Sequence, residues 1–174
     1  MLRVYLAGPD VFVARPERRG EVLKAICAGA GLEGVFPLDP APAAGEGSLA
    51  ERIARGNEAH IRSCGAVIAN LTPFRGPGSD AGTVYEIGFA RALGLTVFGW
   101  SESTVSYADR CRIADPAAAR DEDGRLRDRD GLEIEEFGLA DNLMITCGIA
   151  FSGGRIFTGP GLDGFRECVG SLSR

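Results

Sequence analysis

Two carboxylates six residues apart, Asp80 and Glu86, lie in the glycine-rich segment "GSDAGTVYEIGFARALG" (78–94) of this 174-residue chain. The segment predicts a loop that turns into a helix, with Glu86 in the first turn. The partial positive charge of a helix N-terminus favours an ionised carboxylate there. An ionised carboxylate facing a cleft is the nucleophile needed to attack a sugar anomeric carbon. The segment therefore offers a nucleophile at Glu86 and, at Asp80, an acceptor for a substrate hydroxyl.

A structural interpretation of the same residues stays open. Thr83 and Glu86 have the spacing of a capping box, in which two side chains bind free backbone N–H groups at a helix start. Asp80 is equally typical of a turn or of a helix N-cap. Gly82 permits either a tight turn or the close approach of a ligand. Spacing alone does not decide between capping and catalysis.

Other chemistries find little support in the sequence. The glycine-rich loop lacks the G-K-[ST] of a P-loop, and "AGPDVF" (7–12) lacks the G-x-G-x-x-G pattern of dinucleotide binding. The five cysteines are scattered, none forms a C-x-x-C pair, and His60 is the only histidine. These patterns favour neither a metal site nor a Cys/His nucleophile. We therefore expect no cofactor and no metal.

Charge and hydropathy exclude several partners. A formal net charge of −5 argues against binding to nucleic acid polymers or anionic membranes. No apolar run approaches the roughly 20 residues of a membrane span, and the opening "MLRVYLAGPD" does not read as a signal peptide. Scattered cysteines fit a reducing compartment. We expect a cytoplasmic protein.

The elements that must position the carboxylates alternate between strands and helices. Short, nearly continuous apolar runs predict five buried parallel strands, at 2–7, 34–38, 66–71, 96–100 and 155–159. Helical stretches are expected at 16–30, 49–63, 83–93 and 162–172. This alternation predicts an α/β fold, a single domain over residues 1–174 with a flavodoxin-like or Rossmann-like doubly wound, five-stranded parallel sheet.

The glycine-rich segment is expected at the functional edge of this sheet. Ligands bind open α/β sheets beyond the carboxyl ends of the strands. The loops 7–12, 39–40 and 70–83 follow the first, second and third predicted strands. A capping box alone does not explain why Glu86 lies at this edge.

One segment interrupts the alternation. Residues 101–136 are charged and poor in core residues, which predicts a solvated, partly mobile excursion, above all over 119–131. A long insertion of this kind can also supply a lid or an oligomer contact. The stretch "FGLADNLMITCGIAF" (137–151) that follows is apolar enough for a buried or interface helix.

Four segments carry a resemblance to a known family. They occur in the family's order and are "YLAGPDVF", "NEAHIRSCGAVIANLTPFRG", "SDAGTVYEIGFARALG" and "FGLADNLMI". Together they resemble the nucleoside 2-deoxyribosyltransferases, in particular the trypanosomal-type branch, over most of the chain apart from residues 101–133. The resemblance implies a flavodoxin-like fold, no cofactor, and exchange of the base on 2′-deoxyribonucleosides through a covalent deoxyribosyl intermediate, an activity of nucleoside salvage.

The resemblance also assigns roles by position. It implies that Glu86 is the nucleophile, that Asp80 holds the sugar 5′-hydroxyl, and that Tyr5 places an aromatic hydroxyl near the nucleophile. The residues expected around the substrate are Gly8, Phe12, Asn57, Asn70, Gly82 and Asn142.

Asn142 and Asn57 need separate comment. Asn142 corresponds to an asparagine that reaches into a neighbouring subunit's site, which implies a homo-oligomer, dimer or higher, with shared active sites; as an alternative, it caps the helix that follows. Asn57 stands where some members have an aspartate. An amide can hydrogen-bond a base but transfers no proton at neutral pH, so Asp80 or water would protonate the leaving base, or base contacts would suffice.

The expected activity is transfer of 2-deoxyribose between a deoxynucleoside and a free nucleobase, by double displacement at Glu86. A first alternative is a hydrolase of deoxynucleoside 5′-monophosphates. Asp80 disfavours it, because a carboxylate repels a phosphate dianion by roughly 1–4 kcal/mol, although Arg75 lies nearby. A second alternative is a non-catalytic nucleotide-binding module on the same fold, in which Glu86 is occupied by the Thr83 capping box.

Overall fold

A five-stranded, all-parallel sheet forms the centre of the molecule in the computed structural model, which describes residues 1–41 and 46–173. The strand order is β2-β1-β3-β4-β7. The strands are β1 (Leu2–Ala7), β2 (Leu32–Val35), β3 (Ala66–Asn70), β4 (Thr96–Ser101) and β7 (Ile156–Thr158). This order is the flavodoxin-like one, and it confirms the predicted single-domain α/β fold.

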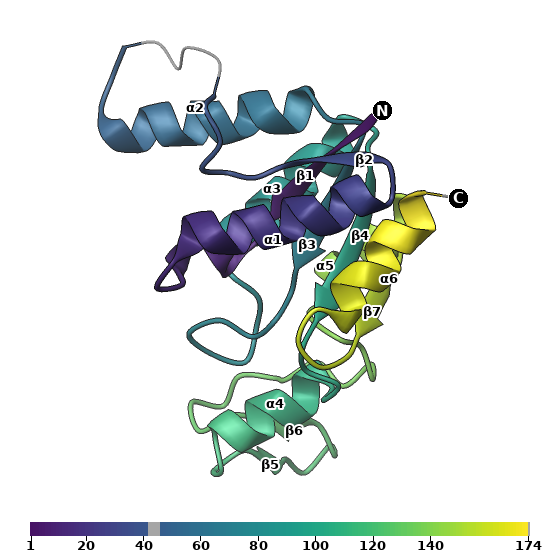
Figure 1. Cartoon of the computed structure of the whole chain (residues 1–174). Helices are drawn as coiled ribbons and strands as arrows, with labels where there is room; N and C mark the ends of the chain where they lie inside the picture. Colours follow the sequence, from purple (N-terminus) through teal and green to yellow (C-terminus); the bar gives the residue numbers. More distant parts are fainter. Residues whose placement is uncertain (42–45, 174) are drawn as a thin grey trace.

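Helices cover both faces of the sheet, as expected for a doubly wound fold (Figure 1). They are α1 (Pro16–Gly29), α2 (Leu49–Arg62), α3 (Ala81–Ala92), α5 (Leu143–Phe151) and α6 (Asp163–Leu172). Helices α1 and α6 pack with one apolar core cluster, and α2, α3 and α5 pack with the other. Successive residues of β1 alternate between the two clusters, because side chains of a strand point to opposite faces. Tyr5 therefore points to the face that α3 covers.

Helix α3 begins earlier than the sequence predicts. Its first residue is Ala81 rather than Thr83, and Asp80 is the N-cap, whose side chain accepts a hydrogen bond from the Thr83 N–H at 2.9 Å. Aspartate is among the strongest N-cap residues. The alternative of a capping box between Thr83 and Glu86 is therefore not realised, and Glu86 lies in the second turn, beyond the reach of most of the helix dipole.

The second strand is also displaced from its prediction. It spans Leu32–Val35 instead of 34–38. The chain turns directly after it, since the Asp39 N–H donates to the Phe36 carbonyl and the Phe36 N–H donates to the Asp39 side chain. The apolar residues 36–38 thus belong to the turn at the carboxyl edge of the sheet rather than to the strand.

The charged excursion after β4 has secondary structure of its own. It holds α4 (Tyr107–Ala114) and a short antiparallel pair, β5 (Ala119–Arg120) with β6 (Leu126–Arg127). Figure 1 shows it beyond the carboxyl end of β4. A small apolar cluster, made of Ala108, Cys111, Leu126 and Ile134, holds it together.

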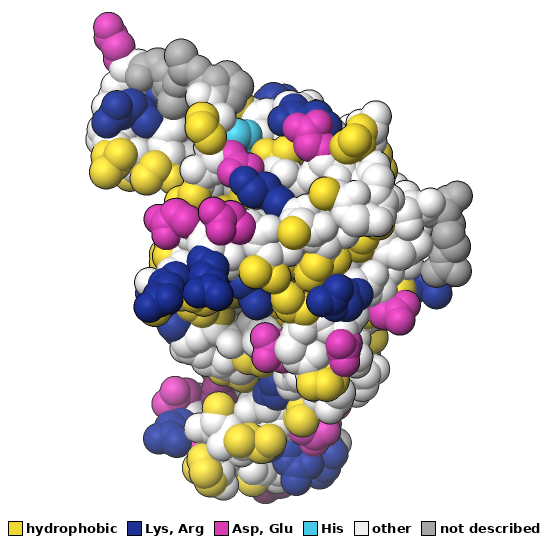
Figure 2. All heavy atoms as spheres, viewed as in Figure 1, with side chains coloured by type: hydrophobic (Ala, Val, Ile, Leu, Met, Phe, Trp, Pro, Cys, Tyr) yellow, Lys and Arg dark blue, Asp and Glu magenta, His cyan; other side chains and the backbone are white. Residues whose placement is uncertain are grey.

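Ion pairs explain the charged composition of this excursion. They join Arg120 to Glu136, Arg125 to Glu133, Arg127 to Asp121 and Arg129 to Asp115. Figure 2 shows acidic and basic side chains intermingled over this part of the surface. The expectation of a solvated segment holds for these side chains, which are mostly exposed, but it missed a helix and a hairpin that place the opposite charges side by side.

Candidate active site

A cavity of about 320 Å³ opens at the carboxyl edge of the sheet, between the loop after β1, helix α2 and the start of α3. Most of the residues predicted from the sequence line it, namely Gly8, Phe12, Asn57, Asp80, Gly82 and Glu86. A second hollow of about 400 Å³ between α2 and α3 shares Ile53, Asn57, Gly82 and Glu86 with the first. Glu86 therefore faces a space that is larger than either hollow alone.

Glu86 is held through one carboxylate oxygen. The Tyr5 hydroxyl donates to Glu86 Oε1 at 2.6 Å, and Asn57 Nδ2 lies 3.5 Å from the same oxygen. Burial raises the pKa of Glu86 to about 7; the Tyr5 hydrogen bond lowers it and the nearby charge of Asp80 raises it. The helix dipole expected to favour the ionised form acts weakly here, because Glu86 lies in the second turn, and burial dominates its pKa.

Tyr5 is a fixed hydrogen-bond donor. Its side chain is fully buried beneath α3. Burial, followed by the charge of Glu86, raises the pKa of the phenol far above its usual range. The hydroxyl therefore stays protonated, and it donates to Glu86 whether the carboxylate is neutral or charged.

The two carboxylate oxygens of Asp80 have different surroundings. Its Oδ2 caps α3, accepting from the Thr83 N–H at 2.9 Å and from Thr83 Oγ1 at 3.0 Å. With the described residues it makes no hydrogen bond through Oδ1, so this oxygen is available to a ligand in the cavity. Gly82 keeps this corner open, because a Cβ there would lie 3.1 Å from Asp80 Oδ2.

The loop after β1 depends on Gly8. Its φ of 155° is a backbone conformation that L side chains rarely adopt, and a Cβ would lie 2.6 Å from the Cβ of Asn70 and 2.9 Å from Asp10 Oδ2. The following 3-10 helix, η1 (Pro9–Phe12), carries Phe12 to the cavity. Only glycine allows the loop to cross so close to the end of β3.

An aromatic and cationic stack covers the outer side of this loop. Phe12 is 59% exposed and stacks on Phe74, with ring centroids 5.4 Å apart. The Arg75 guanidinium lies over both rings, 5.3 Å from the centroid of Phe12 and 4.6 Å from that of Phe74. Arg75 also has a φ of 56°, the only positive value at a non-glycine position in the described chain. The stack joins the loops after β1 and β3.

The structure does not bring Asn70 to the cavity. Its Nδ2 donates to Asp10 Oδ2 at 2.9 Å, and its Oδ1 accepts from the Thr72 N–H at 3.0 Å. Asp10 in turn pairs with Arg19 at 2.7 Å. Asn70 is buried in this network, where it supports the loop after β1 through Asp10. The sequence instead predicts a contact between Asn70 and the substrate.

Asn142 also lies outside the cavity of its own chain. It is the N-cap of α5, with Oδ1 accepting from the Met144 N–H at 2.9 Å. Its Nδ2 donates to Glu135 Oε1 at 2.5 Å. The capping alternative considered from the sequence is therefore realised within the chain, and the role in a neighbouring site stays a prediction.

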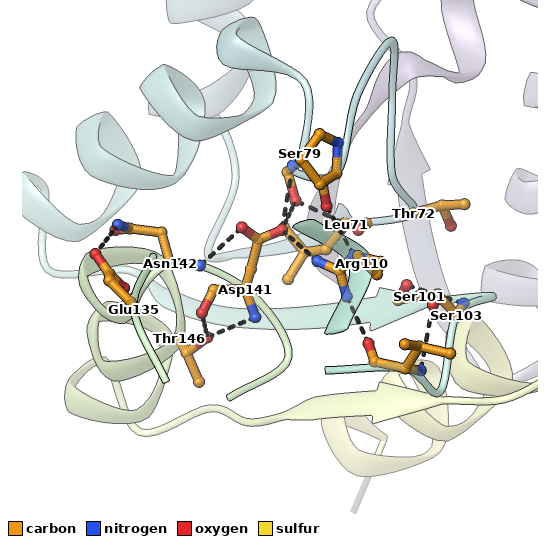
Figure 3. A network of polar contacts seen from close by, with 12 residues as sticks. Leu71, Thr72, Ser79, Ser101, Ser103, Arg110, Glu135, Asp141, Asn142 and Thr146 are labelled. Atoms are coloured by element: carbon orange, nitrogen blue, oxygen red, sulfur yellow. Dashed lines mark hydrogen bonds and ion pairs between the residues drawn. The ribbon is translucent and has the colours of Figure 1, made fainter. Parts of the chain in front are cut away.

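Sequence reasoning missed two charged residues close to the site. Asp141 and Arg110 form a buried pair that contacts Ser79, the residue before Asp80 (Figure 3). The adjacency of Asp141 to Asn142 in "FGLADNLMI" was the only available signal. Arg110 carried none, because it belongs to the charged excursion.

Two classes of feature are absent from the part of the chain that the structure describes. Over residues 1–41 and 46–173, no group of three or more His, Cys, Asp or Glu side chains is placed to hold a metal ion. Within the same ranges, every helix is too short or too polar to cross a membrane.

Comparisons with known proteins identify a family that matches most of the chain. The family described as nucleoside 2-deoxyribosyltransferase matches residues 4–144. A curated but uncharacterised protein of Schizosaccharomyces pombe is 31% identical over 188 residues, which cover 98% of this chain and 88% of that protein.

Solved structures give the same result. A 2-deoxyribosyltransferase from Leishmania mexicana superposes with a TM-score of 0.72 at 29% identity, covering 99% of this chain and 97% of that one. A conserved protein from Enterococcus faecalis shares the fold, with a TM-score of 0.61, 20% identity and 99% of both chains covered. The chain belongs to the nucleoside 2-deoxyribosyltransferase family.

Proposed function

We propose that the protein transfers 2-deoxyribose between the nucleobases of 2′-deoxyribonucleosides through a covalent deoxyribosyl–Glu86 intermediate. The observation that carries the proposal is the environment of Glu86, a carboxylate that faces the cavity and is held by neutral donors. Both hydrogen bonds that it makes with described residues use Oε1. We therefore assign Oε2 to the attack on C1′ of the sugar.

The reaction is a double displacement. In the first step Oε2 bonds to C1′ while the C1′–N bond breaks, and the electron pair leaves with the base, which takes up a proton. In the second step a ring nitrogen of the incoming base attacks C1′ and loses its proton, and the ester bond breaks to regenerate the carboxylate. Two inversions at C1′ give net retention.

Tyr5 and Asn57 direct this chemistry without taking part in bond formation. Hydrogen bonds to Oε1 stabilise the carboxylate and orient the other oxygen. Asn57 lines both hollows, which supports a second role as a hydrogen-bond partner of the base. Its amide holds no proton to transfer at neutral pH, and Asp80 is needed as a charged acceptor, so the leaving base takes its proton from water or leaves with the help of base contacts alone.

Asp80 is proposed to recognise the sugar. Its Oδ1 accepts a hydrogen bond from the 5′-hydroxyl, while Oδ2 continues to cap α3. A carboxylate at this position favours a 5′-hydroxyl over a 5′-phosphate, because like charges repel. The similarity over nearly the whole chain to the Leishmania mexicana 2-deoxyribosyltransferase supports the same substrate class.

We also propose a homo-oligomer, at least a dimer, in which Asn142 serves the neighbouring site. Met144 and Phe151 of α5 are 69% and 78% exposed, and closed two-fold pairing is the commonest way to bury such side chains. Mixing inactive Glu86→Ala and Asn142→Ala chains should restore part of the activity after subunit exchange. If the mixture stays inactive after subunit exchange has been demonstrated, the active site is not shared between subunits.

One incubation tests the proposed activity. The protein is mixed with deoxyinosine and adenine, and the products are separated by chromatography. We expect deoxyadenosine and hypoxanthine in equal amounts. Free deoxyribose without deoxyadenosine would indicate a hydrolase instead, and binding without any product would indicate a binding module.

A second measurement tests the intermediate. Acid quenching after incubation with deoxyinosine alone should give a protein whose intact mass has gained one deoxyribosyl group. The adduct should be absent from Glu86→Gln, which keeps the shape of the side chain but lacks the nucleophilic charge. An unlabelled wild-type protein that still transfers deoxyribose would exclude the covalent route.

A further inference from the structure

A buried ion pair connects the charged excursion to the loop before Asp80 (Figure 3). Asp141 Oδ2 lies 3.5 Å from Arg110 Nη2, and the two side chains are 1% and 8% exposed. The same oxygen accepts hydrogen bonds from the Ser79 N–H at 3.1 Å and from Ser79 Oγ at 2.6 Å. Asp141 thus binds Ser79, the residue directly before Asp80, which is the carboxylate proposed to bind the sugar.

Arg110 holds the same loop from another direction. Its Nε donates to the Pro77 carbonyl at 2.7 Å, and its Nη1 donates to the Val105 carbonyl at 2.7 Å. Within the loop, the Phe74 N–H donates to the Gly78 carbonyl at 3.0 Å. The backbone on both sides of Gly78 is therefore tied to one ion pair.

The second oxygen of Asp141 extends the network to α5. Oδ1 accepts from the Asn142 N–H at 2.8 Å, where Asn142 is the N-cap of that helix. A single carboxylate therefore fixes the loop before Asp80 and the start of α5 relative to each other. Burying an ion pair gains little stability over an apolar pair of the same size, so a role in geometry accounts for it better than a role in stability.

We propose that Asp141 and Arg110 are positioning residues, which hold Asp80 where its Oδ1 meets the 5′-hydroxyl of the substrate; this rests on the function proposed above. Displacing a binding group by about 1 Å can cost a hundredfold in rate. The excursion contacts the loop after β3 through this pair and through Glu102, whose N–H donates to Thr72 Oγ1 at 3.1 Å; of these contacts, those of the pair lie next to Asp80. Neither Arg110 nor Asp141 lines the two hollows that Glu86 faces.

The test compares two substrates in Asp141→Asn, deoxyinosine and its 2′,5′-dideoxy analogue, which lacks the 5′-hydroxyl. We expect kcat/KM for deoxyinosine to fall about 10-fold, and that for the analogue to change by less than about 2-fold. A purely structural role would lower both by the same factor, and that result would overturn the proposal.

A double-mutant cycle gives a second readout. Asp80→Ser keeps a helix-capping side chain but loses the longer, charged group. If Asp141 acts through Asp80, the double variant should lose no more deoxyinosine activity than Asp80→Ser alone, within about 2-fold. Losses that multiply would show that the two residues act independently, against the proposal.

Two further variants separate positioning from folding. Ser79→Ala removes one of the two Ser79 groups that donate to Asp141, and it should reproduce the same substrate pattern with a smaller loss of about 3-fold. Leu126→Ala removes apolar contacts from the core of the excursion while leaving the ion pair intact, so it should affect both substrates equally. Selective loss of deoxyinosine activity in Leu126→Ala would overturn the assignment to the pair.

Amide hydrogen exchange distinguishes failure of this inference from failure of the proposed activity. Asp141→Asn should speed exchange at the Ser79 amide whether or not the protein transfers deoxyribose. Unchanged exchange in the variant overturns the positioning role. A wild type that is inactive on deoxynucleosides, with faster exchange in the variant, overturns the proposed function and leaves the link between the pair and the loop in place.

Discussion

The Glu86 cavity and the charged excursion use carboxylates in opposite ways. In the cavity, Glu86 meets the neutral donors Tyr5 and Asn57, and burial raises its pKa to about 7. In the excursion, Asp115 meets Arg129 at 2.7 Å, and hydrogen bonds from Arg129 hold the pKa of that carboxyl well below its usual range. The first group exchanges its proton near neutrality, whereas the second stays charged.

This difference shows that surroundings decide what a carboxylate can do. A carboxylate bound to a guanidinium has its lone pairs engaged and its charge neutralised, so it serves as a structural group. A carboxylate held through one oxygen by uncharged donors keeps the other oxygen available for bond formation. Asp141 is a structural carboxylate of this kind, bound to the Arg110 guanidinium, although it lies beside the site.

The largest effect is expected from removing Glu86. Glu86→Ala should reduce transfer by at least about 10³-fold, because the remaining cavity carboxylate, Asp80, is committed to capping α3. Thermal unfolding should show a folded protein. Near wild-type transfer in this variant would contradict the assigned nucleophile.

The next effect concerns the 5′ end of the substrate. The wild type should use deoxynucleosides at least about 10-fold better than their 5′-monophosphates, because Asp80 repels the phosphate. Asp80→Ser should narrow this gap while keeping the cap of α3. Steady-state rates on the two substrates measure this preference. A wild type that prefers monophosphates would support the alternative that the protein is a hydrolase.

The pH dependence follows from the pKa of Glu86. Since attack requires the charged form, kcat/KM should fall about 10-fold per pH unit below pH 7 and level off above it. The stability of the fold changes with pH in the opposite direction to the activity. The pKa of Glu86 rises from 4.5 to about 7 on folding. Glu86 therefore contributes at most about 3 kcal/mol to the free energy of unfolding; this contribution is fully present below pH 4.5 and is lost as the pH rises through 7. Glu86→Gln should remove this pH dependence from the unfolding curve.

A smaller effect is expected from Tyr5→Phe. The Tyr5 hydrogen bond lowers the pKa of Glu86, so its loss should move the midpoint of the activity profile up by roughly one pH unit. Tyr85→Phe is a matched control, because the Tyr85 hydroxyl donates to Glu58 and not to Glu86. An unmoved midpoint in Tyr5→Phe would mean that the titrating group is not Glu86.

Most of the fold could be predicted from the sequence, because buried parallel strands leave continuous apolar runs. The errors have local causes. Residues 36–38 are as apolar as a strand, yet Asp39 closes a turn over them. The hairpin β5–β6 consists of two-residue strands, with Arg127 of β6 paired to Asp121 next to β5, and such a contact leaves no hydrophobic periodicity in the sequence.

The site was predictable only where a motif pointed to it. Glu86, Asp80 and Asn57 follow from the resemblance, and the structure brings them to one cavity. Asn70 does not line this cavity, and its contact with a substrate stays a prediction; a polar side chain at a strand end can face a ligand or a neighbouring loop, and spacing does not distinguish these directions. Arg110 was missed because its partner lies 31 residues away in the chain.

The smallest effect is expected from a surface ion pair of the excursion. Arg125 Nη1 and Glu133 Oε2 lie 3.2 Å apart, with side chains 56% and 53% exposed. Solvent screens such pairs, so Arg125→Gln should leave transfer unchanged within about 2-fold and Tm within about 2 °C. Arg110→Gln makes the same chemical change in the buried pair, where it leaves Asp141 with an unpaired charge, and it should lower both quantities much more. Equal losses in the two variants would show that the excursion supports the site through its charge as a whole rather than through one pair.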